Sequence, residues 1–323
     1  MAHINIDGAQ NVEVSKPIPS QKSPQEQLEI MEAYTRAHKN GANLDKAFRE
    51  IHCLKVLFPR LFRTLEPGDQ IAGRLDFLPI GFGSVTSIGG VGHYCVFHKL
   101  RAFKSLLKTE EEKARVDALY DYWQYHDVKS IYCQDVLTED TTGRFIDCKY
   151  PFMATARLSG MMLDYQKLMR LGVNGLIEEI QRQDLTKPFI QASLEAMKLF
   201  QTVISYQIDL VKEAKKEASL DWKQDLDVME EDLIWIKEHK PVTFHQALQL
   251  FWLYALCAGC INYGRMDMVL GPYLKKDMDD GRLSEEKGAG IYCFFMENDR
   301  KSQNDGQWSY YRRWTRKRKC RSL

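Results

Sequence analysis

The sequence predicts a helix-rich protein with one glycine-rich stretch of turns and short strands, on the strength of three observations. Apolar residues make up 44% and charged residues 28% of the 323 residues, so the chain has material for a sizeable core and lacks the composition of a disordered protein. Over most of the chain, apolar residues recur every three or four positions, which is typical of amphipathic helices. Residues 64–96 break this pattern with seven glycines and two prolines, and that density predicts turns and short strands. At this length, one large domain or two of ordinary size are expected.

Helices are expected on both sides of the glycine-rich segment. Residues 1–22 are polar with two prolines, which predicts a loose N-terminal arm. Ser23-Pro24-Gln25-Glu26 has the pattern of an N-cap, a first-turn proline and a capping glutamate, and predicts a helix to about Lys39. A second helix is expected over about 44–57, after an Asn-Gly pair that ends the first. Beyond the glycines, helices resume over about 99–127.

Three further helices are predicted in the second half of the chain. Thr186-Lys187-Pro188 opens a long one that runs to about Ala218, with Phe189 at the start of its apolar stripe. Another covers about 222–239. The last, from Phe244 to about Cys260, is apolar on nearly every side and must therefore be buried all round.

Several classes of protein are excluded by composition. The longest apolar run, from Ala247 to Ile261, is interrupted by Gln249 and is shorter than the roughly 18 residues of a membrane span. The first seven residues lack the basic and apolar regions of a signal peptide. Eight cysteines are too few for a disulfide scaffold, so a reducing compartment is expected. A cytoplasmic protein without a membrane partner is predicted.

The charge is unevenly distributed along the chain. Residues 299–323 are predicted to form a basic tail, and from residue 300 onward nine lysines and arginines accompany one acid, Asp305. Residues 1–299 have 36 basic and 43 acidic residues, and this mildly acidic body does not favour nucleic acid as a partner.

The single CxxC motif, Cys257-Ala258-Gly259-Cys260, has two chemical interpretations, and neither fits well. A zinc site needs two more ligands at a matching spacing, and a thioredoxin-type site needs the pair at a helix N-terminus. This pair instead ends an apolar helix. Buried structural cysteines are the favoured interpretation.

Other titratable residues are weak candidates for a site. His93 and His98 are five apart, which suits no helical metal pair and favours surface or hydrogen-bonded histidines. Asp127 closes an expected helix and is predicted to lie on a solvated face. Arg157 lies in a mostly apolar stretch, where a buried ion pair is favoured over the alternative of a substrate-carboxylate anchor.

Several longer stretches share their order and register with one known family. The stretch from Pro241 to Trp252 reads Pro-Val-Thr-Phe-His-Gln-Ala-Leu-Gln-Leu-Phe-Trp. Four further matching stretches are Gly264-Arg265-Met266-Asp267, Pro272-Tyr273-Leu274-Lys275-Lys276-Asp277 with Gly281-Arg282-Leu283, Leu163-Asp164-Tyr165-Gln166-Lys167-Leu168 with Leu171-Gly172-Val173-Asn174-Gly175-Leu176, and Glu66-Pro67-Gly68-Asp69-Gln70-Ile71-Ala72-Gly73. Together they resemble the pyruvate formate-lyase domain of glycyl radical enzymes over about residues 25–297.

The resemblance implies a fold and a chemistry. Residues 23–298 would form an incomplete pyruvate formate-lyase domain, the N-terminal part of a ten-stranded α/β barrel. In the family, a radical-SAM activating enzyme makes a radical on a glycine, which passes to a cysteine that abstracts hydrogen from a small-molecule substrate. The outcomes are anaerobic C–C, C–O or C–N cleavage, or formate acetyltransfer. No bound cofactor is implied; the partners would be the activating enzyme and, as an option, a second subunit in a homodimer.

The sequence departs from the family pattern at both radical carriers. The family's thiyl cysteine follows the Gly-Arg-Leu stretch, where this chain has only Cys293 and Cys320, neither in a Gly-Cys context. The radical-glycine motif Arg-Val-x-Gly-Tyr is absent from the sequence. No catalytic residue is therefore assigned, and the chain is expected to be inactive alone. The alternative is a non-catalytic helical fragment that binds a full-length paralogue or an activating enzyme.

The basic tail suggests a change of reading frame. Codons for the stretch after Gly306, read one nucleotide later, permit Asn-Gly-Arg-Ile-Ile-Gly-Gly-Gly-Arg-Glu-Asn-Glu-Asn, which looks like the family's continuation. A frameshifted and truncated chain is thus expected, with an evolved basic-aromatic tail as the alternative.

Sequence leaves the substrate open. Diol dehydratases of the family place a histidine where this chain has Gly160, which disfavours dehydration without establishing pyruvate. Arg157 is the one residue nominated for a substrate anion, and the segment from Gly81 to Gly92 is expected to shape the pocket.

Overall fold

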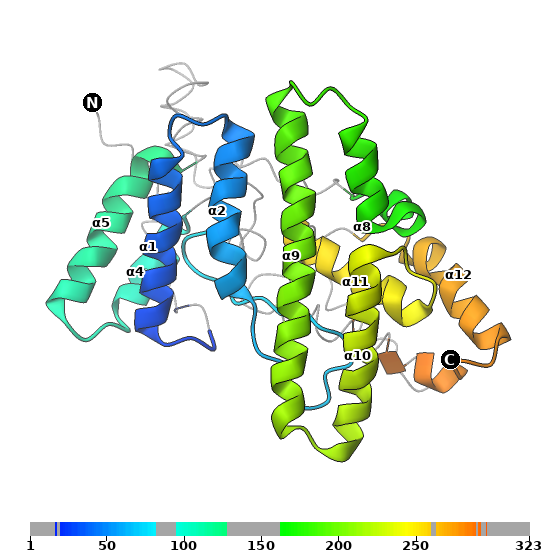
Figure 1. Cartoon of the computed structure of the whole chain (residues 1–323). Helices are drawn as coiled ribbons and strands as arrows, with labels where there is room; N and C mark the ends of the chain where they lie inside the picture. Colours follow the sequence, from blue (N-terminus) through cyan, green and yellow to red (C-terminus); the bar gives the residue numbers. More distant parts are fainter. Residues whose placement is uncertain are drawn as a thin grey trace. The chain divides into compact units, whose positions relative to one another are not determined.

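Residues 17, 20–81, 95–127, 162–259, 263–288, 290, 291 and 295 are described by the computed structural model of the chain (Figure 1). They fall into two compact units. The first is drawn from residues 1–42, 52–61 and 76–160, and the second from residues 43–51, 62–75 and 161–323.

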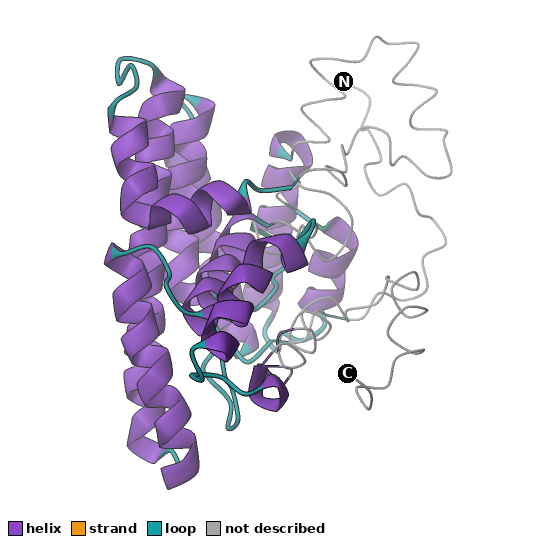
Figure 2. Ribbon diagram, turned by 90° about the vertical axis from the view of Figure 1, so that its right-hand side faces the viewer, coloured by secondary structure: helices purple, strands orange, loops and turns teal. Residues whose placement is uncertain are grey.

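The predicted helix-rich character is confirmed for the described residues. Figure 2 draws them as helices and loops, with no strand among them. The glycine-rich prediction also holds where it can be seen, because residues 62–81 contain no helix and take part in two isolated antiparallel bridges, Phe62 with Leu75 and Ile80 with Cys95. The ten-stranded barrel stays a prediction.

The first unit is a small group of amphipathic helices. They are α1 (Pro24–Asn40), α4 (Phe97–Lys104) and α5 (Glu110–His126). Ser23 and Glu26 form the predicted capping box of α1, each side chain bonding the other's backbone N–H. In the core of this unit, Trp123 Nε1 donates to Thr35 Oγ1 at 2.9 Å, and this bond satisfies the indole N–H where α1 packs on α5.

Asp127 contradicts its predicted place on a solvated face. The residue follows α5 but is fully buried, and its Oδ1 accepts the Cys95 backbone N–H at 3.0 Å. A buried carboxylate needs such partners because desolvation penalises its charge. Helical spacing could not predict this, since the donor comes from a segment 32 residues away.

The second unit has α11 at its centre. Its helices are α8 (Tyr165–Gln181), α9 (Pro188–Glu217), α10 (Leu220–Glu238), α11 (Phe244–Ala258) and α12 (Met266–Asp279). Residues of α2 (Lys46–Leu61) belong to both units. The predictions of α2 and of α9 to α11 are confirmed, and α11 is buried along nearly its whole length.

Helices α9 and α10 run antiparallel, as Figure 1 shows. Lys215 pairs with Asp227 at 2.6 Å and also with Glu230, which ties the C-terminal end of α9 to the N-terminal half of α10. Phe189 was expected on the apolar stripe of α9 but is 71% exposed, because it lies in the first turn.

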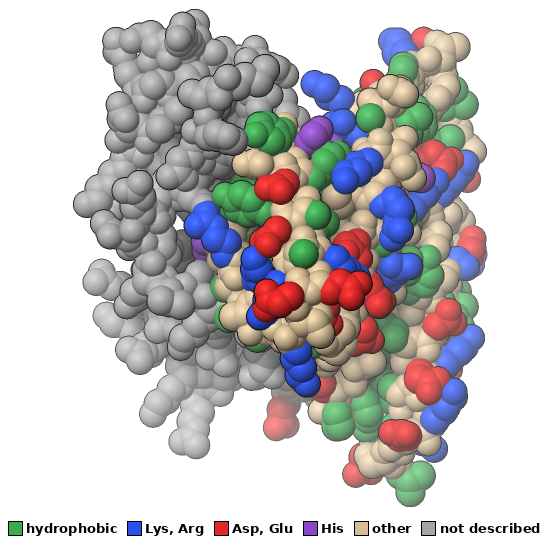
Figure 3. All heavy atoms as spheres, turned by 90° about the vertical axis from the view of Figure 1, so that its left-hand side faces the viewer, with side chains coloured by type: hydrophobic (Ala, Val, Ile, Leu, Met, Phe, Trp, Pro, Cys, Tyr) green, Lys and Arg blue, Asp and Glu red, His purple; other side chains and the backbone are tan. Residues whose placement is uncertain are grey.

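The described surface carries mixed charge. Acidic and basic side chains are interspersed over the coloured part of the face drawn in Figure 3. Among the helices that the structure describes, none is long and apolar enough to cross a bilayer.

Candidate functional site

Three side chains on one face of α11 hold an extended segment of main chain. His245, Gln249 and Trp252 are spaced i, i+4 and i+7, so they project from the same side of the helix. We call these three residues the α11 clasp. His245 Nε2 lies 2.7 Å from the carbonyl oxygen of residue 70, Gln249 Nε2 donates to that of residue 72 at 2.9 Å, and Trp252 Nε1 donates to that of residue 73 at 2.6 Å.

The middle member of the clasp makes two bonds to one residue. Gln249 donates to the Ala72 carbonyl and accepts the Ala72 N–H through Oε1 at 2.7 Å. Both residues are completely buried, so this amide satisfies two main-chain groups that water cannot reach. The polar residue that interrupts the longest apolar run is therefore required by the backbone packed against it.

Gly73 allows the segment to approach the helix. Its φ is +109°, and a Cβ there would lie 2.6 Å from Leu253 Cδ2. A side chain would thus meet both backbone strain and a steric contact with α11. This explains why the Glu66–Gly73 stretch, which resembles the family, ends in glycine.

The carboxylate of Asp232 supports the clasp from α10. His245 Nδ1 lies 2.6 Å from Asp232 Oδ2, and Gln246 Nε2 donates to Asp232 Oδ1 at 2.8 Å. The carboxylate of Asp232 on α10 is thus bound on both oxygens in a largely buried position. With both ring nitrogens engaged, His245 acts as a structural link between α10, α11 and residue 70 rather than as a free general base.

The Lys-Lys-Asp and Gly-Arg-Leu stretches meet at the start of α11. Asp277 is buried near the end of α12, and its Oδ2 accepts the Phe244 N–H, the first of α11, at 2.7 Å. A carboxylate at a helix N-terminus also complements the positive end of the helix dipole. Arg282 Nε lies 3.3 Å from Asp277 Oδ1 and partly neutralises that charge.

The Asp-Tyr and Gly-x-x-Gly stretch shapes α8. Asp164 caps the helix by accepting the Lys167 N–H at 3.0 Å, and Tyr165 stacks on Phe251 with ring centroids 3.9 Å apart. Gly172 interrupts α8 with a φ of +67°, and a Cβ there would lie 2.9 Å from the backbone of Lys240. These family stretches therefore position helices.

The structure does not test the residues that the sequence singles out for a site. Arg157, His93, Cys260 and Gly160 lie outside the described residues, as does all of the pocket-shaping segment after Gly81. The nomination of Arg157 for a substrate anion stays a prediction. No group of three or more metal-ligating side chains is found among the residues that the structure describes.

Cys257 is half-buried near the end of α11, and burial raises the pKa of its thiol far above the ordinary range. The thiolate is the reactive form, and at a pH below the pKa the thiolate fraction falls tenfold with each unit by which the pKa is raised.

We expect iodoacetamide at pH 8.5 to alkylate Cys257 at least about tenfold more slowly than a free cysteine peptide. The alkylation rate of Cys257 should keep rising with pH above 9.5, where the rate of the free peptide levels off. Peptide mass spectrometry measures it, and a rate equal to that of the peptide would contradict the burial argument.

Sequence comparison places the chain in a family. A profile described as pyruvate formate lyase-like matches residues 7–300. The chain belongs to the pyruvate formate lyase-like family. The motif-based resemblance to glycyl radical enzymes is thereby confirmed. Enzymes of this family are activated by radical-SAM enzymes and act on small molecules.

Two curated relatives are a dehydratase and a sulfite-lyase by name. Over 204 residues the chain is 28% identical to (2S)-3-sulfopropanediol dehydratase from Klebsiella oxytoca. The match covers 56% of this chain and 24% of that enzyme. Over 143 residues it is 27% identical to isethionate sulfite-lyase from Oleidesulfovibrio alaskensis, or 38% of this chain and 17% of that enzyme. The chain spans about a quarter or less of the length of these relatives.

Solved structures show the same fold. A glycyl radical enzyme from Archaeoglobus fulgidus superposes with a TM-score of 0.65 at 20% identity, covering 88% of this chain and 39% of that one. The B12-independent glycerol dehydratase from Clostridium butyricum gives a TM-score of 0.65 at 17% identity, covering 93% of this chain and 40% of that one.

Proposed function

We propose that this chain is the helical N-terminal part of a glycyl radical lyase that eliminates a leaving group from a small polar substrate. The observation that carries the proposal is the chemistry of the curated relatives, two of which are dehydratases, and it outweighs the glycine at position 160, where diol dehydratases of the family have a histidine. Sulfopropanediol dehydratase, isethionate sulfite-lyase and trans-4-hydroxy-L-proline dehydratase are all elimination enzymes by name. Formate acetyltransfer and C–C cleavage are less well supported, because no acyltransferase is among these relatives.

The chain contributes positioning rather than radical chemistry in this proposal. It lacks the thiyl cysteine context and the radical-glycine motif, so a radical could be neither stored on it nor passed to substrate. The clasp, the bond from Asp277 to the start of α11 and the interruption of α8 at Gly172 hold these helices and residues 70–73 in fixed positions relative to one another. The chain acts only together with the remaining part of the fold, in a cytoplasmic assembly that an activating enzyme converts to the radical form.

A fusion protein tests the proposed function. Residues 1–298 are joined to the portion of the Klebsiella oxytoca dehydratase that follows the segment matched by this chain. We expect the fusion, after anaerobic activation, to show a glycyl radical by electron paramagnetic resonance and to dehydrate sulfopropanediol. The unfused chain and the unfused dehydratase portion serve as controls and should give no product. A radical-bearing fusion that releases no elimination product from sulfopropanediol, isethionate or hydroxyproline would overturn the proposed reaction class.

We also propose that residues 299–323 arise from a changed reading frame. The family match ends at residue 300, where the basic tail begins. Sequencing the locus across codon 300 tests this. An open frame one nucleotide over that encodes a Gly-Cys loop and an Arg-Val-x-Gly-Tyr motif is expected, and its absence would favour the binding-fragment alternative.

A further inference from the structure

Two Asn-Gly pairs lie among the residues that the structure describes, and their surroundings differ. Asn40-Gly41 stands at the end of α1, and Asn174-Gly175 lies inside α8. An asparagine before glycine is prone to deamidation, because glycine has no Cβ to keep its backbone nitrogen away from the neighbouring side-chain amide. Whether the reaction occurs in the folded chain depends on whether these two groups can meet.

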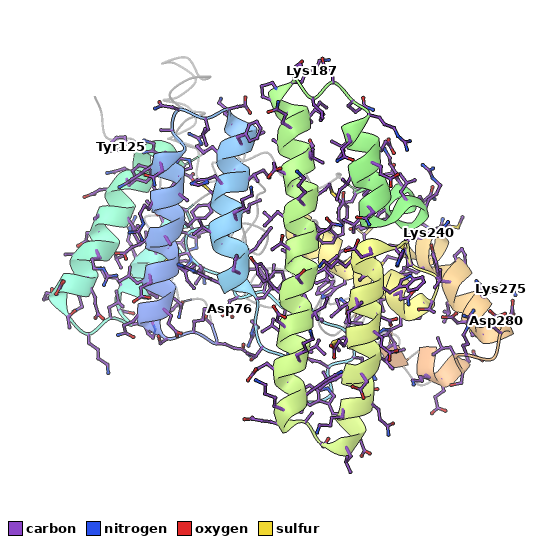
Figure 4. The ribbon with its side chains drawn as sticks, viewed as in Figure 1. Asp76, Tyr125, Lys187, Lys240, Lys275 and Asp280 are labelled. Atoms are coloured by element: carbon purple, nitrogen blue, oxygen red, sulfur yellow. The ribbon has the colours of Figure 1, made fainter. Side chains whose placement is uncertain are left out.

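Asn174 is held on both atoms of its amide. Its Nδ2 donates to the Glu238 carbonyl oxygen at 2.8 Å and to Glu238 Oε2 at 3.0 Å, and its Oδ1 accepts from Gln201 Nε2 at 2.6 Å. Glu238 ends α10, two residues before Lys240, which Figure 4 labels. Three hydrogen bonds to α9 and α10 must therefore open before the Asn174 side chain can turn towards the Gly175 nitrogen.

Asn40 has no such restraint. It is the exposed last residue of α1, and its side chain makes no hydrogen bond with the part of the chain that the structure describes. The Gly41 N–H donates to the Ala37 carbonyl oxygen at 3.0 Å, which is the last bond of the helix. Terminal bonds of this kind open far more often than interior ones, and opening frees the Gly41 nitrogen to reach the Asn40 side chain.

We propose that Asn40 is a deamidation site, at which the chain alters its own backbone with time and loosens the end of α1. The Gly41 nitrogen attacks Asn40 Cγ and forms a cyclic imide. The bond from Cγ to Nδ2 breaks, and the departing amide group takes the Gly41 amide proton and leaves as ammonia. Water then opens the imide at either of its carbonyl carbons and gives aspartate or isoaspartate, so no co-reactant other than water is needed.

The product acts on the junction of α1 with α5. The two residues before Asn40 help to hold this junction, because His38 Nδ1 lies 2.8 Å from Tyr122 Oη and Lys39 Nζ lies 4.4 Å from the centroid of the Tyr122 ring. A carboxylate at residue 40 is unfavourable at the negative end of the helix dipole. The isoaspartyl form also adds a carbon to the main chain, which moves the Gly41 N–H away from its acceptor in the last turn. Both effects weaken the turn that carries His38 and Lys39.

Peptide mass spectrometry of the full chain, aged in mildly alkaline buffer, tests the site. In the native chain Asn40 should deamidate at least about tenfold faster than Asn174, because only Asn174 must break three side-chain hydrogen bonds first. In guanidinium chloride, where the fold protects neither pair, the two rates should be similar. Equal rates in the native chain, or an Asn40 that stays intact there, would overturn the proposal.

Hydrogen exchange measures the consequence for α1. The aged chain should lose amide protection over residues 37–42, while the protection of α9 stays unchanged. Asn40→Gln is the matched control, because it keeps an exposed amide but would have to close a larger, less favourable ring, so this variant should keep its protection after the same ageing. Undiminished protection over residues 37–42 in the fully deamidated chain would show that residue 40 does not control the end of α1 and would overturn that part of the proposal.

Discussion

Replacing Gly172 by alanine should destabilise the second unit by about 3 kcal/mol, the sum of left-handed backbone strain and overpacking. Gly172 has a φ of +67° within α8, which costs a residue with a Cβ about 1–2 kcal/mol. The new methyl group would also lie 2.9 Å from both N and Cα of Lys240. Backbone atoms cannot relieve a contact by changing rotamer as a side chain can, so α8 would have to shift away from the residues that follow α10. Lys240 is labelled in Figure 4.

Two other glycines are controls that separate the cost of backbone strain at Gly172 from the cost of its steric contact with Lys240. Gly281 has a φ of +69° but open space around its Cβ position, so Gly281→Ala should cost only about 1 kcal/mol. Gly271 lies within α12 with an ordinary φ and no contact beyond its chain neighbours, but Pro272 follows it. The helix propensity gained by Gly271→Ala is therefore offset by the contact of the new Cβ with the proline ring, and stability should change by less than about 0.5 kcal/mol. Urea unfolding followed by circular dichroism measures all three. Equal losses for Gly172→Ala and Gly281→Ala would show that the Lys240 contact carries no energy.

The sequence predicts local structure well wherever local chemistry decides it. The capping box at Ser23 and Glu26, the proline that opens α9 and the apolar length of α11 are all short-range signals, and the corresponding helices are present. Asp127 shows the limit of such signals, because a residue adjoining a polar helix face gives no sign of a buried backbone donor far away in sequence. Phe189 shows another, since the first turn of a long helix can project beyond its neighbours.

The candidate site is built from contacts that spacing alone cannot specify. In the sequence, Gln249 breaks an apolar run and belongs to the family-like stretch from Pro241 to Trp252, and a buried amide in such a run signals a polar partner. That partner, Ala72, lies 177 residues away. Asp277 likewise belonged to a recognised stretch, but its bond to the Phe244 N–H depends on the packing of α12 against α11. Resemblance therefore located these residues, and only the three-dimensional fold gave them a role.

Gln249→Leu should destabilise the protein by about 3–5 kcal/mol, because it removes both hydrogen bonds of a buried amide and leaves the Ala72 N–H and C=O unpaired. Leucine fits a helix that is otherwise apolar, so helix propensity and hydrophobicity would both favour the variant. A large loss of stability would therefore come from the unpaired N–H and C=O groups of Ala72. Gln224→Leu on the exposed face of α10 is the matched control, and its effect should stay within about 0.5 kcal/mol.

Hydrogen exchange shows which backbone amides the Gln249 side chain protects. If the clasp holds residues 70–73 against α11, the Ala72 amide should exchange far more slowly than its neighbours in the native protein and lose that protection in the Gln249→Leu variant. Trp252 still donates to the Gly73 carbonyl in the variant, so the segment should loosen locally before the whole unit unfolds. A variant as stable as the native protein, with Ala72 still protected, would show that the segment is held by apolar packing and that the amide pair is dispensable.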